Sequence, residues 1–216
     1  MNFSIDLDRI MYILQGVIIT LEYTVLSVIF GLCLGVLLSL ARLSKIGALS
    51  VIAKIYISVF RGTPLLVQLS IVYFVAPSIY EFDISVFQAG IIAFSMNSAA
   101  YVSEHIRGGI QAMPRGQFEG AVALGVPYSL MMKDIILPQA VRHILPSLVN
   151  EVINLLKETA IISMIGGMDI MRRAQIISAE TYDYLTPMLV AALCYYILVV
   201  FFAAIARYLE VRLRIK

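Results

Sequence analysis

The sequence predicts an all-α membrane protein, built as a single transmembrane domain over residues 1–216 with five spanning helices. Composition is the first reason, because 61% of the 216 residues are hydrophobic, 14% are charged and the mean hydropathy is +0.92. Soluble domains are about 45–50% apolar and about 25% charged. The second reason is a set of long apolar runs, most of them near the roughly 20 residues that an α-helix needs to cross a bilayer. The third is that charged residues, glycines and prolines separate these runs.

The other bulk properties exclude several classes of protein. The net charge of +2 is too small to indicate a nucleic-acid partner. Cys33 and Cys194 lie inside apolar runs, so a disulfide framework is not expected. Acidic residues precede the first apolar run, so no cleavable signal peptide is predicted. The sequence suggests neither a metal site nor a catalytic site in this chain.

The apolar runs place the spanning helices along the chain. Residues 1–12 precede them and form either a short interfacial helix, capped by Ser4 or Asp6, or an unstructured terminus. In the first span Gly31 and Gly35 are four residues apart, a spacing that lets two helix backbones approach closely. The expected spans are residues 13–41, 64–79, 84–104, 144–166 and 185–206.

The apolar run of residues 46–79, which contains the second span, is interrupted before that span begins. Gly62-Thr63-Pro64 breaks the helical pattern, because Pro64 disfavours helical geometry at Thr63. We expect a short helix before the break, anchored on the cytoplasmic side by Arg61, and the true span from about Pro64 onward. Such a break at membrane depth is tolerated only where it is buried in protein or lines a cavity. Glycine pairs are expected to end the third and fourth spans, at Gly108-Gly109 and Gly166-Gly167.

Basic residues determine the expected orientation, because cytoplasmic loops carry an excess of Lys and Arg. If the C-terminus is cytoplasmic, five spans place the N-terminus outside. The outer side then carries only Arg9, Arg172 and Arg173. The cytoplasmic side and its edges carry the much larger set of Arg42, Lys45, Lys54, Arg61, Arg107, Arg115, Lys133, Arg142, Arg207, Arg212, Arg214 and Lys216.

The stretch from Glu119 to Pro138 does not fit a spanning helix. Gly125 can adopt the left-handed conformation that closes a first helix, Pro127 suits the first turn of a second helix, and Pro138 is expected to end that helix. The apolar side chains here have no lipid to face, so they could dock into a groove on a soluble partner; an ordinary cytoplasmic loop is the alternative. These side chains are Ala121, Leu124, Tyr128, Leu130 and Met131.

The spacing within this stretch resembles the EAA motif of ABC importer permeases. Glu119-Gly120-Ala121 is followed after three residues by Gly125 and after nine more by Ile135-Ile136-Leu137-Pro138, with Gly120 in place of the family's middle alanine. Other stretches are similar to the polar amino acid uptake subfamily, which includes histidine, arginine and glutamine permeases. They are Phe60-Arg61-Gly62-Thr63-Pro64-Leu65-Leu66-Val67-Gln68, Glu104 to Ile110 running into Gly116-Gln117, and Lys157-Glu158-Thr159-Ala160. The resemblance covers nearly the whole chain from residue 13 on.

The resemblance implies a type I ABC importer permease fold and a permease subunit of a bacterial or archaeal cell membrane, not an enzyme. Two permease subunits, identical or different, would form the path, and an extracytoplasmic binding protein would deliver the amino acid. Two cytoplasmic ATPases would bind ATP and Mg and drive alternating access, since this chain has no phosphate-binding loop and no cofactor of its own. The implied coupling loop is residues 115–138, with coupling residues Glu119, Gly120, Ala121, Gly125, Tyr128, Leu137 and Pro138.

Polar groups inside the third and fourth spans are the candidates for substrate contact. A charge within a spanning helix costs about 2.5–3.5 kcal/mol on insertion scales, so it is normally paired or lines a cavity. Carboxylates, Glu22 included, outnumber Lys157 here, which favours a cationic amino acid over a neutral or acidic one. Alternatively, Lys157 pairs with Glu151 or Glu158 and only holds helices together. The candidates are Asn97, Ser98, Tyr101, Glu104, Glu151, Asn154, Lys157 and Glu158.

Two other classes of membrane protein remain as alternatives. A gradient-driven secondary transporter usually has repeated halves, and no internal repeat is evident in the sequence. A membrane-embedded enzyme needs a nucleophile with a base, or a cluster of metal ligands, inside its spans. Ser98 has only His105 near it, two helical turns away.

Overall fold

The computed structural model describes the backbone of residues 6–213 and the side chains of residues 6–208. The expected cap Ser4 and the basic residues Arg214 and Lys216 lie outside the described residues, as does the side chain of Arg212. The described chain is all-helical, which confirms the predicted class. Its helices are α1 (Leu7–Leu43), α2 (Gly47–Gly62), α3 (Leu65–Ser70), the π-helical η1 (Ile71–Val75), α4 (Ala76–Tyr80), α5 (Val86–Gln111), α6 (Arg115–Ala123), α7 (Tyr128–Leu130), the π-helical η2 (Met131–Ile136), α8 (Leu137–Glu158), the 3₁₀-helical η3 (Thr159–Ile165), α9 (Ile170–Thr181) and α10 (Leu185–Leu213).

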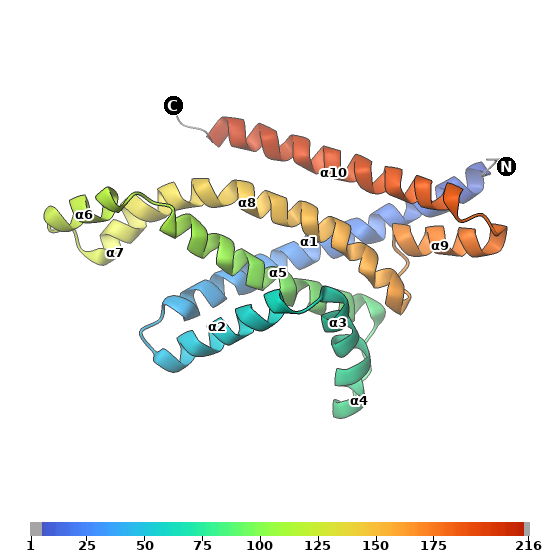
Figure 1. Cartoon of the computed structure of the whole chain (residues 1–216), viewed down its shortest axis with the longest axis horizontal. Coiled ribbons are helices and arrows are strands. Elements are labelled where there is room, and N and C mark those ends of the chain that lie inside the picture. Colours follow the sequence, from blue (N-terminus) through green and yellow to red (C-terminus); the bar gives the residue numbers. More distant parts are fainter. Residues whose placement is uncertain (1–5, 214–216) are drawn as a thin grey trace.

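The long helices α1, α5, α8 and α10 extend along the long axis of the molecule (Figure 1). Helices α6 and α7 form one end, and α9 and the N-terminus lie at the other end (Figure 1). Helix α2 packs beside α1 and α5, and α3 and α4 point away from the long axis (Figure 1). The two ends of the molecule therefore differ. The stretch from Glu119 to Pro138, called the hinge from here on, lies at one end, and α9, which packs against α1 and α10, lies at the other.

Glycine lets α1 and α5 pack closely. A Cβ added to Gly31 would lie 2.8 Å from the Cβ of Ser98, and one added to Gly35 would lie 2.6 Å from Cγ1 of Val102. Both distances are far shorter than ordinary van der Waals contact, so only glycine fits this crossing. The packing role predicted for Gly31 and Gly35 is confirmed.

The helical break predicted at Gly62-Thr63-Pro64 is present. Helix α2 ends at Gly62, Pro64 occupies the N-cap of α3, and the helices before and after the break are bent by 107°. Helices α1 and α10 are long and apolar enough to cross a membrane, and α2 with α3–α4 adds a third candidate if the bent pair counts as one span; this test covers the described residues only. Five spans therefore remain a prediction.

Neither Gly108-Gly109 nor Pro138 ends a helix as the sequence predicted. Helix α5 continues through Gly108-Gly109 to Gln111, because Gly109 packs against Ile144 of α8 instead of ending the helix. Pro138 does not end a helix either, since it lies in the first turn of α8, where the missing N–H costs little. The π-helical η2 leads directly into α8, so the hinge joins α8 without a loop. Gly166, with φ of 91°, ends η3 as predicted.

Candidate functional site

A polar network closes the helical break. Buried Gln68 donates from Nε2 to the carbonyls of Phe60, at 2.9 Å, and Thr63, at 3.0 Å. Asn97 of α5 donates from Nδ2 to Gln68 Oε1, at 2.9 Å, and to the Phe60 carbonyl, at 3.2 Å. The last carbonyls of a helix have no partner within that helix. Asn97, a predicted substrate residue, therefore fixes the broken end of α2 to α5.

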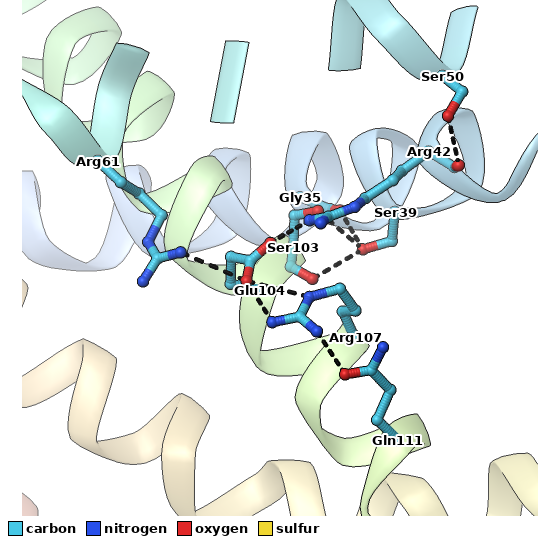
Figure 2. A network of polar contacts seen from close by, with 9 residues as sticks. All are labelled: Gly35, Ser39, Arg42, Ser50, Arg61, Ser103, Glu104, Arg107 and Gln111. Atoms are coloured by element: carbon cyan, nitrogen blue, oxygen red, sulfur yellow. Dashed lines mark hydrogen bonds and ion pairs between the residues drawn. The ribbon is translucent and has the colours of Figure 1, made fainter. Parts of the chain in front are cut away.

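Three arginines surround the carboxylate of Glu104 (Figure 2). Arg107 reaches Oε2 with Nε at 3.1 Å and Nη2 at 2.7 Å. Arg61 of α2 places Nη1 3.3 Å from the same oxygen, and Arg42 at the end of α1 binds Oε1. The side chain of Glu104 is 14% exposed. This carboxylate therefore ties α1, α2 and α5 together at one point.

The two remaining candidates on α5 have different surroundings. The Tyr101 ring lies beneath the guanidinium of Arg61, which is 5.4 Å from the ring centre, within the range of a cation–π contact. Ser98 is buried against Gly31 of α1, and its hydroxyl has no hydrogen-bond partner among the described residues. Asn97 and Ser98 thus contact different helices, α3 in one case and α1 in the other.

The candidates on α8 lie at the surface of this chain, except one. Asn154, Lys157 and Glu158 are exposed. Glu151 is buried, and its Oε2 lies 3.8 Å from Nε2 of His105 on α5. Within residues 6–208, Lys157 forms no ion pair with Glu151 or Glu158. Glu151 therefore faces His105 of α5 inside the bundle, at a distance too long for a direct hydrogen bond.

Sequence reasoning missed several members of these networks. Arg42 was assigned only to topology, Arg107 to topology and to a motif, and Gln68 only to a motif, while His105 was not assigned a partner. One signal was present in the sequence, because Arg107 follows Glu104 by three residues and such pairs share a helix face. Arg42 is separated from Glu104 by 62 positions, so only the folded structure shows that pair.

The predicted hinge has the expected turn at its centre. Gly125 has φ of 73°, its N–H donates to Val122, and the N–H of Val126 donates to Ala121. These two bonds form a Schellman motif, which satisfies the last carbonyls of α6. A Cβ at Gly125 would contact nothing within 4 Å, so the backbone angle and not crowding requires glycine here.

The hinge exposes part of the apolar set predicted to dock. Leu124 is 84% and Tyr128 70% exposed, and Leu130 is exposed as well. Ala121 and Met131 are each 4% exposed, because they pack inside the chain against α8. The prediction that those two dock into a partner was wrong. Glu119, Gly120, Leu137 and Pro138 are exposed.

Asp169 lies at the opposite end of the molecule. Its carboxylate caps α9 by accepting from the backbone N–H of Arg172, and it accepts from the Tyr195 hydroxyl, both at 2.8 Å. Burial raises the pKa of Asp169 to about 6, although these hydrogen bonds oppose the shift. Tyr195 belongs to α10, so Asp169 joins α9 to that helix.

The chain is similar to known proteins over nearly its entire length. Residues 11–215 match the family described as binding-protein-dependent transport system inner membrane component. A putative glutamine transport system permease protein of Rickettsia felis is 59% identical over 202 residues, covering 94% of this chain and 93% of that protein. An arginine transport system permease protein of Bacillus subtilis is 51% identical over 214 residues, covering 99% and 98%.

Solved structures show the same fold. The structure of an amino acid ABC transporter with histidines superposes with a TM-score of 0.92 at 39% identity, covering 97% of this chain and 99% of that chain. An inward-facing methionine ABC transporter gives a TM-score of 0.79 at 20% identity, covering 98% and 100%. The second match supports the fold alone.

Proposed function

The chain belongs to the family of binding-protein-dependent transport system inner membrane components, and we propose that it forms the path for a cationic amino acid in an ATP-driven importer. It is a permease component of an amino acid ABC importer with the fold of type I importer permeases. The observation that carries the proposal is the near-full-length similarity to an arginine permease protein. A soluble domain with this surface would aggregate, whereas a multi-pass inner membrane protein exposes apolar side chains to lipid.

We propose five spans, with the N-terminus outside and the C-terminus cytoplasmic. The support is the distribution of charge over the two ends of the bundle. The hinge lies at one end, and the N-terminus and α9 lie at the other (Figure 1). Arg42 is in the last turn of α1, and Arg107 is near the end of α5, which leads into the hinge. Lys and Arg favour the cytoplasmic side, so the hinge end is assigned to the cytoplasm.

A second permease chain, a copy or a relative, would complete the path. Asn154, Lys157 and Glu158 are exposed on α8, within the span predicted over residues 144–166. Exposure of charges to lipid costs about 2.5–3.5 kcal/mol each on insertion scales. A water-filled path between two permeases removes that cost, so this face of α8 is proposed to border the path.

The proposed substrate contacts come mainly from α8. Glu151 and Glu158 would accept from a cationic side chain and an ammonium group, and Lys157 would donate to the carboxylate. Asn154 lies between them in the sequence and can both donate and accept. Glu104 already binds three guanidinium groups, so it is proposed to hold the helices and not the substrate. Asn97, Ser98 and Tyr101 are proposed to shape the path from α5.

The hinge is proposed to receive force from a cytoplasmic ATPase that binds ATP and Mg. Leu124 and Tyr128 extend from the turn between α6 and α7 and are available to a groove on that partner. Because η2 leads directly into α8, a displacement of the hinge would move the helix that carries Glu151. This continuity is a physical route from ATP closure to the substrate path. An extracytoplasmic binding protein is proposed to deliver the amino acid.

Reconstitution with the ATPase and binding protein tests the proposal. Arginine, lysine or histidine should stimulate ATP hydrolysis and be taken up, with no need for an ion gradient. Glu151→Gln should reduce uptake of the cationic substrate, whereas Glu180→Gln, an exposed carboxylate on α9, should not. Uptake driven by a gradient without ATP would contradict the importer mechanism.

Glutamine is the second candidate substrate. The observation in its favour is the 59% identity to the rickettsial glutamine permease protein, which is higher than the 51% identity to the arginine permease protein. Stimulation of ATP hydrolysis by glutamine, with no response to arginine, lysine or histidine, would favour it and overturn the cationic assignment.

A further inference from the structure

A cavity of about 440 Å³ lies where α1, α2 and α5 meet. It is a shallow depression that is widely open to the outside, and polar and apolar atoms contribute almost equally to its walls. The hinge end of the molecule was assigned above to the cytoplasm, and Arg42 at the end of α1 belongs to that end. The lining residues are Arg42, Lys54, Ile57, Ser58, Arg61, Gly62 and Glu104.

The cavity carries an excess of positive charge. Arg42 and Arg61 both point toward Glu104 (Figure 2), and Arg107 binds the same carboxylate from α5. One carboxylate therefore balances three guanidinium groups. Lys54 adds a further cation, and within residues 6–208 its ammonium forms no ion pair. A cavity with this charge is suited to an anion, whose oxygens would accept from Lys54 and from the unused N–H groups of Arg61.

An apolar surface adjoins the cationic cavity on α2. Lys54, Ser58 and Arg61 recur at helical spacing and so share one face of α2. The next face around the helix carries Ile55 and Val59, both exposed. A ligand that suits both faces has an anionic group joined to a long apolar part.

We propose that this cavity binds the headgroup phosphate of an anionic phospholipid from the cytoplasmic leaflet, with the acyl chains along Ile55 and Val59. Basic pockets between helices on the cytoplasmic side of a membrane suit anionic headgroups. The lipid completes the charge balance around Glu104 and fixes the α2 end of the helical break. This proposal goes beyond amino acid transport and does not depend on which amino acid is carried.

The experiment measures lipid preference of the purified importer. The complex is placed in nanodiscs of phosphatidylcholine that contain a small fraction of spin-labelled phosphatidylglycerol or spin-labelled phosphatidylcholine. We expect phosphatidylglycerol to be preferred by the original chain, and Lys54→Gln to reduce that preference about fivefold, the weight of one basic residue near an anionic surface. Lys54→Arg keeps the charge and should keep the preference.

Lys45→Gln is the matched control. Lys45 is exposed in the connection between α1 and α2 and does not line the cavity. The Lys45→Gln substitution removes the same charge from the same side of the membrane as Lys54→Gln. A non-specific attraction of anionic lipid to the basic surface would therefore weaken equally in both variants. Equal losses in Lys54→Gln and Lys45→Gln, or no loss in either, would overturn the proposal.

Two competition measurements separate the possible sources of the anion. Excess inorganic phosphate should leave the bound phosphatidylglycerol in place, because free phosphate lacks the apolar contact with α2. Displacement by phosphate, with no preference for phosphatidylglycerol over phosphatidylcholine, would assign the cavity to a soluble anion. Displacement by the transported amino acid would assign the cavity to the transport path. Either displacement would refute the lipid assignment while leaving the transport function intact.

Discussion

Replacement of Gly125 by valine tests whether the hinge transmits movement. Gly125 has φ of 73°, a conformation that a β-branched side chain rarely adopts. Forcing such a residue into this region costs about 1–3 kcal/mol. At a cost of about 2 kcal/mol, the native turn becomes roughly thirtyfold less populated. Because the surroundings of Gly125 are open, the effect is confined to the angle between α6 and α7.

The expected result is loss of coupling with retention of the fold. In proteoliposomes that contain the ATPase and the binding protein, Gly125→Val should lower amino acid uptake by at least about tenfold. The upper limit of the loss is the roughly thirtyfold decrease in the population of the native turn. ATP hydrolysis should respond much less to the loaded binding protein. The melting temperature should change little, since the hinge turn is exposed and contacts few buried groups.

Gly120→Ala is the matched control for this measurement. Gly120 lies in the same segment, inside α6 and without the positive φ of Gly125, and a Cβ there also meets nothing within 4 Å. It should transport as well as the original chain. Normal uptake by a folded Gly125→Val chain would refute the reasoning, because the turn geometry would then be unnecessary for coupling. Equal losses in both variants would show that any added side chain, and not the left-handed angle, causes the defect.

Three further changes test contacts inside the bundle. Glu104→Gln leaves three guanidinium groups without a carboxylate and should lower the free energy of unfolding by about 1–2 kcal/mol, less than the roughly 1.5–3 kcal/mol of one hydrogen bond to a charged group because Arg61 and Arg107 are partly exposed. Glu180→Gln should leave the melting temperature unchanged. Gly16→Ala places a Cβ 2.5 Å from a backbone nitrogen of α9 and should cost about 1–3 kcal/mol, whereas Gly47→Ala, in open space, should not destabilise the chain. The pKa of Asp169 is raised to about 6 from the usual 3.8, so the folded chain binds the proton of this carboxyl more tightly than the unfolded chain does. Protonation of Asp169 therefore stabilises the fold fully below pH 3.8, and this stabilisation is lost as the pH rises through about 6. Melting curves of Asp169→Asn should lack this decline, and an unchanged slope would contradict the assignment.

Features that depend on neighbours in the sequence were predictable. The turn at Gly125 required a residue that tolerates positive φ, and only glycine does so without strain. The break at Pro64 followed from the ring of proline, which lacks an N–H. Gly31 and Gly35 indicated close helix packing from their spacing alone. Pro138 was misread, because a proline that could end one helix can equally begin the next.

Features that depend on distant contacts were not predictable in the same way. Asn97 was predicted to contact the substrate, but its side-chain amide donates hydrogen bonds to Gln68 and to the Phe60 carbonyl. Ala121 and Met131 have the same apolar character as Leu124, and only the position of α8 decides which of them is buried. A hydropathy pattern shows that a side chain needs an apolar partner, but not which partner it has.

The sequence by itself determined that this chain is a helical membrane protein with a turn at Gly125 and a break at Pro64, because composition and local backbone preferences set those properties. The tertiary structure alone decided the partners of the charged groups. Glu104 could have faced a substrate, lipid or another helix, and its energy depends on what surrounds it once α1, α2 and α5 are packed. Arg42 and Arg61 lie far from Glu104 in the sequence, and only the packing of these helices brings their guanidinium groups to its carboxylate.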